Sequence, residues 1–277
     1  MKKILIFIGC LCVGMTLTAQ EKPLELPLWA NDAPNNNGLT GEEQQLENGR
    51  VSNISRPSIT VYRPANPNGM AIIMCPGGGY VRLAMNHEGH DMAQWFNAQG
   101  ITFAVLKYRM PNGHADVPLS DAEQAIRLVR QHAKEWQLNH NKIGIMGASA
   151  GGHLAATLAT LYAGTDTRPD FQILLYPVIN MKNGSPSLLG GNASEELKTK
   201  YSPDLQVNKD TPSAFITVSS DDRLAPHSIL YYQALLEKTA PACLHAYPSG
   251  GHGWGFRDDF LYKRQWTEEL EKWLRNF

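Results

Sequence analysis

The amino-acid sequence predicts an α/β fold in which helices cover both faces of a mostly parallel central sheet. Two observations support this prediction. Strand-like and helix-like segments alternate along most of the chain, as expected for βαβ crossovers. The chain is also long enough, at 277 residues with 43% hydrophobic content, to bury one large core. We therefore expect residues 20–277 to form a single domain.

The first 19 residues have the pattern of a secretory signal. Two lysines follow the initial methionine, residues 4–17 are mostly apolar, and small residues lead to a cleavage site after Ala19. An apolar run of roughly 14 residues is too short to cross a bilayer comfortably. We predict export to the periplasm or the extracellular space, without a transmembrane segment. Lipid anchoring at Cys10 or Cys12 is a less favoured alternative, because neither follows a convincing lipoprotein motif.

After this segment, the expected elements follow one another in order. Residues 20–56 are rich in Asn, Pro, Gly and Glu and are predicted to wrap the domain as an irregular extension. Strands are expected at residues 58–62, 70–75, 101–108, 142–146, 171–176, 214–219 and 244–247. Helices are expected at residues 87–99, 120–136, 150–162, 226–238 and 260–277. Residues 180–210 interrupt this alternation, and we expect a short lid-like insertion there, with one helix around residues 194–200.

The strongest helix pattern starts at Ser120-Asp121-Ala122-Glu123. This string is a capping box, in which the serine hydroxyl and the glutamate each satisfy a free backbone N–H. Apolar residues then recur at spacings of three and four as far as Trp136. The sequence therefore predicts a helix that begins at Ser120.

The charge balance and the cysteines narrow the function classes. The formal net charge of -1 arises from 25 basic and 26 acidic residues, which leaves no surplus to neutralise phosphates or anionic lipids. We therefore expect no nucleic-acid partner. Removal of the signal would leave Cys75 and Cys243, each in an apolar run where a disulfide and a buried free thiol are both natural.

Polar residues that could carry chemistry follow three of the predicted strands. Gly147-Ala148-Ser149-Ala150-Gly151 follows the strand at 142–146 and fits the G-x-S-x-G elbow, which exposes a nucleophilic serine hydroxyl. The alternative is a plain glycine-rich turn. Asp221 and Asp222 follow the strand at 214–219, where they could orient a histidine or simply cap the next helix.

A histidine among glycines completes the set. His252 follows the strand at 244–247, and its alternative interpretation is an exposed loop residue. Functional groups gather at the carboxyl ends of parallel strands, so these three sites should lie together. Serine, acid and histidine in that chain order are typical of an α/β-hydrolase.

A glycine-rich loop offers a fourth component. Pro76-Gly77-Gly78-Gly79-Tyr80 follows the strand at 70–75 and corresponds to the oxyanion loop of lipases and esterases. Bare N–H groups there could approach a developing oxyanion and stabilise it by about 3 kcal/mol. A phosphate cradle is the weaker alternative, because no Gly-Lys-Ser/Thr string follows.

The string His87-Glu88-Gly89-His90 is similar to a zinc motif but does not fit it. Its histidines are three residues apart rather than four, and no third ligand is evident. We interpret Asn86 instead as a helix cap followed by a polar first turn. The sequence therefore predicts no metal and no cofactor.

With these motifs, the chain resembles secreted bacterial α/β-hydrolase esterases near the hormone-sensitive-lipase and dipeptidyl-peptidase-like branches, a group that includes acetylxylan and feruloyl esterases. The resemblance spans about residues 60–277. It rests on the strings at residues 76–80, 147–153, 221–226 and 251–255, with shorter matches at 86–89 and 108–111. This chain has Pro76 where the lipase relatives have histidine, and it lacks their long N-terminal helical cap.

The resemblance implies a role for each site residue. Ser149 would be the nucleophile, His252 the general base and acid, and Asp222 the carboxylate that orients His252, with Asp221 as the alternative acid. The oxyanion hole would consist of the backbone N–H groups of the following residues: Gly78, Gly79 and Ala150.

The expected activity is hydrolysis of carboxylic esters through an acyl-enzyme. The resemblance favours removal of acetyl groups from xylan or a related polysaccharide. Tyr80 and Trp254 flank the predicted site and are candidates for substrate binding, although aromatic residues beside glycine loops also serve as packing. The alternatives are a general short-chain carboxylesterase, a dipeptidyl-peptidase-like serine peptidase, and a binding module that has lost catalysis.

Overall fold

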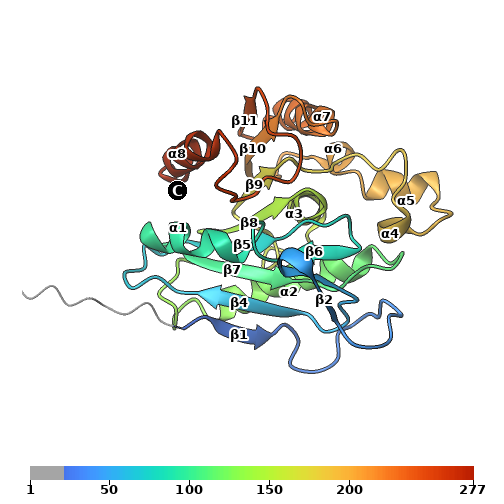
Figure 1. Cartoon of the computed structure of the whole chain (residues 1–277), viewed down its shortest axis with the longest axis horizontal. Coiled ribbons are helices and arrows are strands. Elements are labelled where there is room, and N and C mark those ends of the chain that lie inside the picture. The colour runs from blue at the N-terminus through green and yellow to red at the C-terminus, as the bar shows by residue number, and fades with distance from the viewer. Residues whose placement is uncertain (1–21) are drawn as a thin grey trace, which may run out of the picture.

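An eight-stranded sheet forms the centre of the computed structural model, which describes residues 22–277 (Figure 1). The predicted signal peptide, with Cys10 and Cys12, lies outside these described residues. The strand order is β1-β4-β7-β5-β8-β9-β10-β11. The strands are β1 (Leu24–Pro27), β4 (Ser58–Tyr62), β5 (Ala71–Cys75), β7 (Thr102–Lys107), β8 (Ile143–Ala148), β9 (Phe171–Leu175), β10 (Ser213–Ser219) and β11 (Ala242–Tyr247).

The sheet is parallel from β7 to β11 and antiparallel at one edge. Strand β4 pairs antiparallel with β7, and β1 pairs antiparallel with β4. All residues of β5, β8 and β9 are buried, which explains their nearly continuous apolar sequences, since a parallel strand is covered on both faces. The predicted fold class, a mostly parallel sheet flanked by helices, is confirmed.

Helices connect the parallel strands and cover the sheet. These helices are α1 (Ala93–Ala98), α2 (Asp116–Gln131), α3 (Ala150–Leu161), α7 (Ala225–Glu237) and α8 (Lys263–Leu274). Helix α1 carries the chain across the sheet in the opposite direction to α2, α3 and α7. Because crossovers between parallel strands are right-handed, α1 lies on the opposite face from those three helices. Helix α8 lies near α1 (Figure 1), and Phe256 contacts an aromatic ring of each, Trp95 and Trp266.

The N-terminal extension has more regular structure than the sequence predicted. It contributes β1 to the main sheet and holds β2 (Gln44–Leu46), the 3-10 helix η1 (Glu47–Gly49) and β3 (Arg50–Ser52). Strand β3 pairs with β6 (Arg82–Ala84), which follows the glycine-rich loop, and the three short strands form a second, antiparallel sheet. One of the two partners of β3, the strand β6, is distant in the sequence, so local composition could not reveal that pairing.

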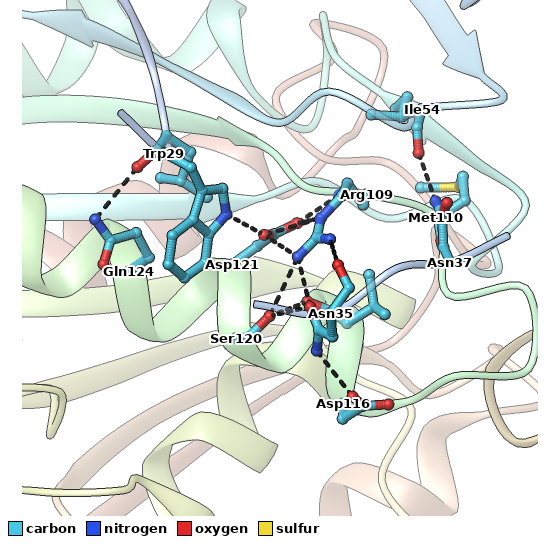
Figure 2. Close-up of polar contacts among 12 residues, drawn as sticks. Trp29, Asn35, Asn37, Ile54, Arg109, Met110, Asp116, Ser120, Asp121 and Gln124 are labelled. Carbon is cyan, nitrogen blue, oxygen red and sulfur yellow. Dashed lines mark hydrogen bonds and ion pairs between the residues drawn. The ribbon is translucent and has the colours of Figure 1, made fainter. Parts of the chain in front are cut away.

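A buried ion pair holds the extension against α2 (Figure 2). Arg109 donates to both carboxylate oxygens of Asp121 at 2.7 and 2.9 Å, and also to the carbonyl of Asn35 at 2.6 Å. Trp29 Nε1 donates to the same carboxylate at 2.9 Å. The side chains of Arg109 and Asp121 are 3% and 0% exposed. Two residues of the extension are thus bonded to an ion pair in the interior.

The predicted start of the helix at Ser120 is wrong. Helix α2 begins at Asp116, so Ser120 and Asp121 lie inside it rather than at its cap. Ser120 Oγ bonds to Asn35 Oδ1 at 3.1 Å and to the carbonyl of Val117 at 2.8 Å, and Glu123 accepts from the backbone N–H of Ala163. The string has the sequence of a capping box, but its side chains have tertiary partners.

Three short helices fill the region predicted as an insertion. They are α4 (Pro186–Leu189), α5 (Glu195–Lys200) and α6 (Pro203–Gln206). The predicted helix corresponds to α5, whose N-cap Ser194 accepts from the N–H of Leu197 at 3.1 Å. Ser187, in α4, donates to the carbonyl of Gly79 at 2.9 Å, so this region contacts the glycine-rich loop.

The predicted helix over residues 87–99 is shorter than expected. It consists of the 3-10 helix η2 (His90–Met92) followed by α1, and η2 has no side-chain cap. The predicted capping role of Asn86 is therefore wrong; its carbonyl instead accepts from the N–H groups of Gly89 and Asp91. The chain remains irregular up to Gly89, and Glu88 is 3% exposed in this segment.

Cys75 and Cys243 are free thiols. They lie on β5 and β11, which are separated by the strands β8, β9 and β10. Neighbouring strands are about 4.8 Å apart, so the two sulfur atoms are too distant for a disulfide. Among residues 22–277, no helix is both long and apolar enough to cross a membrane.

Candidate active site

Ser149 stands at a sharp turn between β8 and α3. Its backbone has φ 53° and ψ -117°, a conformation that non-glycine residues rarely adopt and that costs about 1–3 kcal/mol. The neighbouring glycines allow the turn to pack closely. A Cβ on Gly147 would collide with the carbonyl of Gly151, and a Cβ on Gly151 would collide with the carbonyl of Cys75. Neither glycine of the G-x-S-x-G string could therefore be replaced by a residue with a side chain unless the backbone moved.

Ser149, His252 and Asp222 form one hydrogen-bonded line. Ser149 Oγ is 2.7 Å from His252 Nε2, and His252 Nδ1 is 2.6 Å from Asp222 Oδ2. The Asp222 side chain is fully buried, while the His252 side chain is 32% exposed. Because the carboxylate accepts from Nδ1–H, the free lone pair of Nε2 faces the serine hydroxyl. His252 is therefore placed to take the proton of Ser149.

The two aspartates that the sequence left open have different partners. Asp222 bonds to His252 and also accepts from the N–H of Leu224 at 2.9 Å. Asp221 accepts from the N–H groups of Gly250 and Gly251 at 3.2 and 2.9 Å. Asp221 thus holds the loop that carries His252, while Asp222 contacts the imidazole itself.

The predicted oxyanion donors line the same cleft as Ser149 and His252. Gly78, Gly79 and Ala150 all contribute to this cleft, which has a volume of about 650 Å³. Gly78 has φ +136°, and a Cβ there would collide with the carbonyl of Arg82, so only glycine fits. Ala150 is the first residue of α3, where backbone N–H groups have no partner within the helix.

Glu88 lies directly beneath the glycine-rich loop. Its Oε2 accepts from the N–H of Gly77 at 2.9 Å, and its Oε1 accepts from the Tyr176 hydroxyl at 2.8 Å. The Tyr176 hydroxyl also accepts from the N–H of Gly255 at 2.7 Å, and its ring lies edge-on to His252. Burial raises the pKa of Glu88, while the hydrogen bonds that it accepts from Tyr176 and Gly77 oppose this shift. Glu88 and Tyr176 therefore connect the glycine-rich loop to the loop that carries His252.

The structure places Tyr80 and Trp254 in the packed interior rather than on the wall of the cleft. Tyr80 is 4% exposed and its hydroxyl bonds to His153 Nδ1 at 2.8 Å. Trp254 is 3% exposed, stacks on Phe260 and donates to Ser219 Oγ at 3.0 Å. Neither residue lines the cleft that contains Ser149. Tyr80 borders a neighbouring hollow instead, and the substrate-binding role of both aromatics stays a prediction.

His153, on α3, connects this helix to the glycine-rich loop through a hydrogen bond with Tyr80. Its Nε2 donates to the carbonyl of Tyr201 at 2.8 Å, so its Nδ1 accepts from the Tyr80 hydroxyl. Burial lowers the pKa of His153 to about 4. The imidazole is therefore neutral near pH 7, as this pattern of one donor and one acceptor requires.

The histidines of the rejected zinc motif have separate partners. His87 Nε2 lies 3.3 Å from Arg257 Nη2, and His90 Nδ1 lies 2.9 Å from the Tyr62 hydroxyl. In the described part of the chain, no group of three or more His, Cys, Asp or Glu side chains could hold a metal ion.

Sequence reasoning missed several residues of the site. Glu88 was interpreted as part of a polar first turn, and Tyr176 as the end of a buried strand. Tyr176 has φ +37°, which is unusual for a tyrosine, but no sequence pattern reports a dihedral angle. Four arginines that line the cleft were also missed: Arg50, Arg82, Arg223 and Arg257. They come from separate segments, so only the fold brings them together.

The family comparison agrees with the geometry. The sequence profile of the family described as BD-FAE matches residues 59–175. The chain is 40% identical to an acetylxylan esterase of Xylanibacter ruminicola and 34% identical to endo-1,4-beta-xylanase B of Butyrivibrio fibrisolvens, over 82% and 69% of its own length. It spans about half of the first relative, 49%, and 33% of the second.

A solved structure covers nearly the whole chain. It is the acetyl ester-xyloside bifunctional hydrolase of Caldicellulosiruptor lactoaceticus, which is 33% identical with a TM-score of 0.77. The alignment covers 91% of this chain and 96% of that one. An elbow serine with a histidine and an aspartate, on a fold shared almost end to end with this hydrolase, shows that the chain belongs to the α/β-hydrolase esterase family.

Proposed function

We propose that this protein is a carbohydrate acetyl esterase that removes acetyl groups from xylan or a related polysaccharide. The observation that carries the proposal is the line from Ser149 through His252 to the buried Asp222. No metal or cofactor takes part in the proposed reaction, since the nucleophile, the base and the oxyanion donors all come from the chain.

The reaction would proceed in two halves. As Ser149 Oγ bonds to the ester carbonyl carbon, His252 Nε2 takes the hydroxyl proton. The tetrahedral intermediate then expels the sugar oxygen, which receives that proton from His252. In the second half, a water loses a proton to His252 and attacks the acetyl carbonyl, and the collapse of this intermediate returns the proton to Ser149 and releases acetate. Asp222 keeps the imidazole in the correct tautomer and stabilises the imidazolium.

Backbone N–H groups would stabilise both intermediates. The candidates are Gly78, Gly79 and Ala150, which line the cleft beside Ser149. Each such donor is worth about 3 kcal/mol when it is aimed at the developing oxyanion. The hydrogen bond between Gly77 and Glu88 fixes the loop on which two of these donors lie.

The polysaccharide substrate is supported by the relatives and by the surface next to the cleft. The relatives include proteins named acetylxylan esterase and acetyl ester-xyloside bifunctional hydrolase. A second hollow of about 470 Å³ adjoins the cleft, because Val81 lines both, and amides and hydroxyls such as those of Asn112 and Ser187 line it. This arrangement leaves room for sugar units beyond the acetylated one. With the predicted signal peptide, we also infer export to the periplasm or the extracellular space.

The experiment that tests this function measures acetate release from acetylated xylan beside rates on 4-nitrophenyl esters of increasing acyl length. We expect acetate release and a preference for the acetyl ester. Ser149→Ala should lower kcat by at least about 10⁴-fold on both substrates. A preference for long acyl chains without acetate from the polysaccharide would indicate a general carboxylesterase. Full activity of Ser149→Ala would rule out the proposed mechanism.

A further inference from the structure

We propose that the cleft binds an acidic sugar, a uronic acid residue whose carboxylate pairs with arginines close to the acetylated position. This inference rests on the proposed function, because it names the class of polysaccharide that the same site takes. The observation behind it is the number of arginines around the cleft and the lack of carboxylate partners for them.

The four arginines that line the cleft come from two parts of the structure, the small sheet and the loops after β10 and β11. Arg50 and Arg82 belong to the small sheet, where Arg50 pairs with Ala84 across β3 and β6. Directly paired residues share a face of a sheet, and so do residues two apart on one strand. Arg50, Arg82 and Ala84 therefore present one face to the cleft. Arg223 and Arg257 follow β10 and β11, next to the catalytic acid and base.

These arginines differ from most others in the described part of the chain. Five arginines elsewhere are within 4.0 Å of a carboxylate oxygen, namely Arg109, Arg127, Arg130, Arg264 and Arg275. None of the four cleft arginines forms such a pair with a residue in the range 22–277. Three of them are exposed, and Arg50 is half-buried. Their guanidinium groups are thus available to a ligand.

The two buried carboxylates near the cleft form no ion pair with these arginines. Asp222 is bonded to His252, and Glu88 is bonded to Gly77 and Tyr176. Burial raises the pKa of Glu88 and the charge of Arg257 opposes this shift, so Glu88 offsets part of the charge of that arginine without an ion pair. The net charge of the whole chain is -1, so the excess of arginine is a local property of this cleft.

His87 shows that the positive potential extends across the cleft. Burial, followed by the charges of Arg257 and Arg50, lowers the pKa of His87 to about 4. These two arginines come from segments far apart in the chain, β3 and the loop after β11, and both act on the same imidazole. Neutral His87 accepts a hydrogen bond from Arg257 Nη2, which orients this guanidinium without neutralising it.

The hydrogen-bonding geometry of guanidinium groups and the charged groups found in polysaccharides together indicate which ligand binds here. Arginine is a planar fork that binds carboxylates with two parallel hydrogen bonds. In acetylated plant polysaccharides the anionic groups are the carboxylates of uronic acid units. A neutral acetylated xylan would leave four arginines without a function, whereas an acidic branch next to the acetylated sugar would pair with one or more of them.

The test compares two acetylated xylo-oligosaccharides, one with a uronic acid branch and the same compound after methyl esterification of that carboxyl group. Acetate release is the readout for both. We expect kcat/KM to be about tenfold higher for the free acid. This preference should weaken when salt rises from about 0.05 to 0.5 M, because the Debye length shortens severalfold.

Substitutions of single arginines test whether the preference for the acidic substrate arises in the cleft. Arg223→Gln and Arg257→Gln should each lower the ratio of kcat/KM between the acidic and the methylated substrate by about threefold or more. Arg264→Gln, an exposed arginine on α8, should leave this ratio unchanged. Equal rates on both oligosaccharides, or an acid preference that the two cleft variants do not alter, would overturn this inference and leave the proposed function intact. If neither compound releases acetate, the proposed function fails and this inference with it.

Discussion

Two buried aspartates show how the same side chain serves stability in one region and chemistry in another. Asp121 faces Arg109, and Asp222 faces His252; both carboxylates are fully buried. The difference lies in their partners. Arg109 is itself buried and is also bonded to Asn35, so its guanidinium is occupied. His252 is 32% exposed, and its second nitrogen faces a serine hydroxyl.

This difference teaches that a buried carboxylate paired with an enclosed guanidinium holds segments together, while one bonded to an imidazole that is open at its other nitrogen can support proton transfer. The cleft arginines extend the comparison, because they have no carboxylate partner among the described residues, unlike Arg109. The following predictions test this contrast, from the largest expected effect to the smallest.

Asp222→Asn should produce the largest loss of activity. An amide cannot hold Nδ1–H in the same way, so the imidazole takes the wrong tautomer, and we expect kcat for 4-nitrophenyl acetate to fall by about 10⁴-fold. Steady-state kinetics measures this effect. Asp221→Asn is the matched control, since Asp221 contacts only the backbone of the histidine loop; its kcat should fall far less. Equal losses in both variants would contradict the assigned geometry.

Asp121→Asn should instead act on stability. It leaves Arg109 buried without a counter-charge, and we expect the free energy of unfolding to fall by about 3–5 kcal/mol. Urea unfolding followed by tryptophan fluorescence measures this change. The kcat of the folded fraction should stay unchanged, because Asp121 does not line the cleft. Asp166→Asn, at an exposed ion pair with Arg127, is the control and should cost less than about 1 kcal/mol.

His153 should make stability depend on pH. Burial lowers its pKa to about 4 from 6.5, so the unfolded chain takes up a proton before the folded protein does. The stabilisation is therefore fully present above pH 6.5 and is lost as the pH falls towards 4, by about 3 kcal/mol in total. His153→Gln should lose less stability than the wild type between pH 7 and pH 4.5, as measured by urea unfolding. Exposed His140→Gln should keep the wild-type pH dependence; a parallel curve for His153→Gln would contradict the assignment.

Glu88→Gln should impair the turnover step more than binding. The variant weakens the acceptor that holds the N–H of Gly77, and with it the position of the oxyanion loop. We expect kcat for 4-nitrophenyl acetate to fall by about tenfold with little change in KM, since the loop contacts the oxyanion and not the ground state. Glu135→Gln, with a side chain that is 63% exposed, provides a control of the same chemistry. A rise in KM at constant kcat would show that Glu88 acts on substrate binding instead.

The cleft arginines should contribute least to stability. Arg82→Gln and Arg257→Gln remove exposed side chains without carboxylate partners in the described chain, so we expect changes in the free energy of unfolding within about 0.5 kcal/mol. Denaturant unfolding measures them beside Asp121→Asn. A loss above about 2 kcal/mol would mean that these arginines are structural, like Arg109.

The sequence by itself determined the fold class and two residues of the hydrogen-bonded line, Ser149 and His252. Parallel strands buried on both faces require apolar runs, and the turn at Ser149 requires small residues on each side, so both leave a local pattern. The strand at Ser58–Tyr62 and the short helix around residues 194–200 were predicted correctly for the same reason. In each case the physical cause acts between residues close together in the chain.

The tertiary structure decided everything that depends on distant partners. It placed Asp222 rather than Asp221 on the histidine, because two adjacent residues point to different neighbours. It placed the start of α2 at Asp116 and gave Asp121, inside that helix, a buried partner in Arg109. It also gathered four arginines at one cleft in a chain with a net charge of -1. Composition sums charge over the whole molecule, and only packing shows where the charge lies and whether it has a partner.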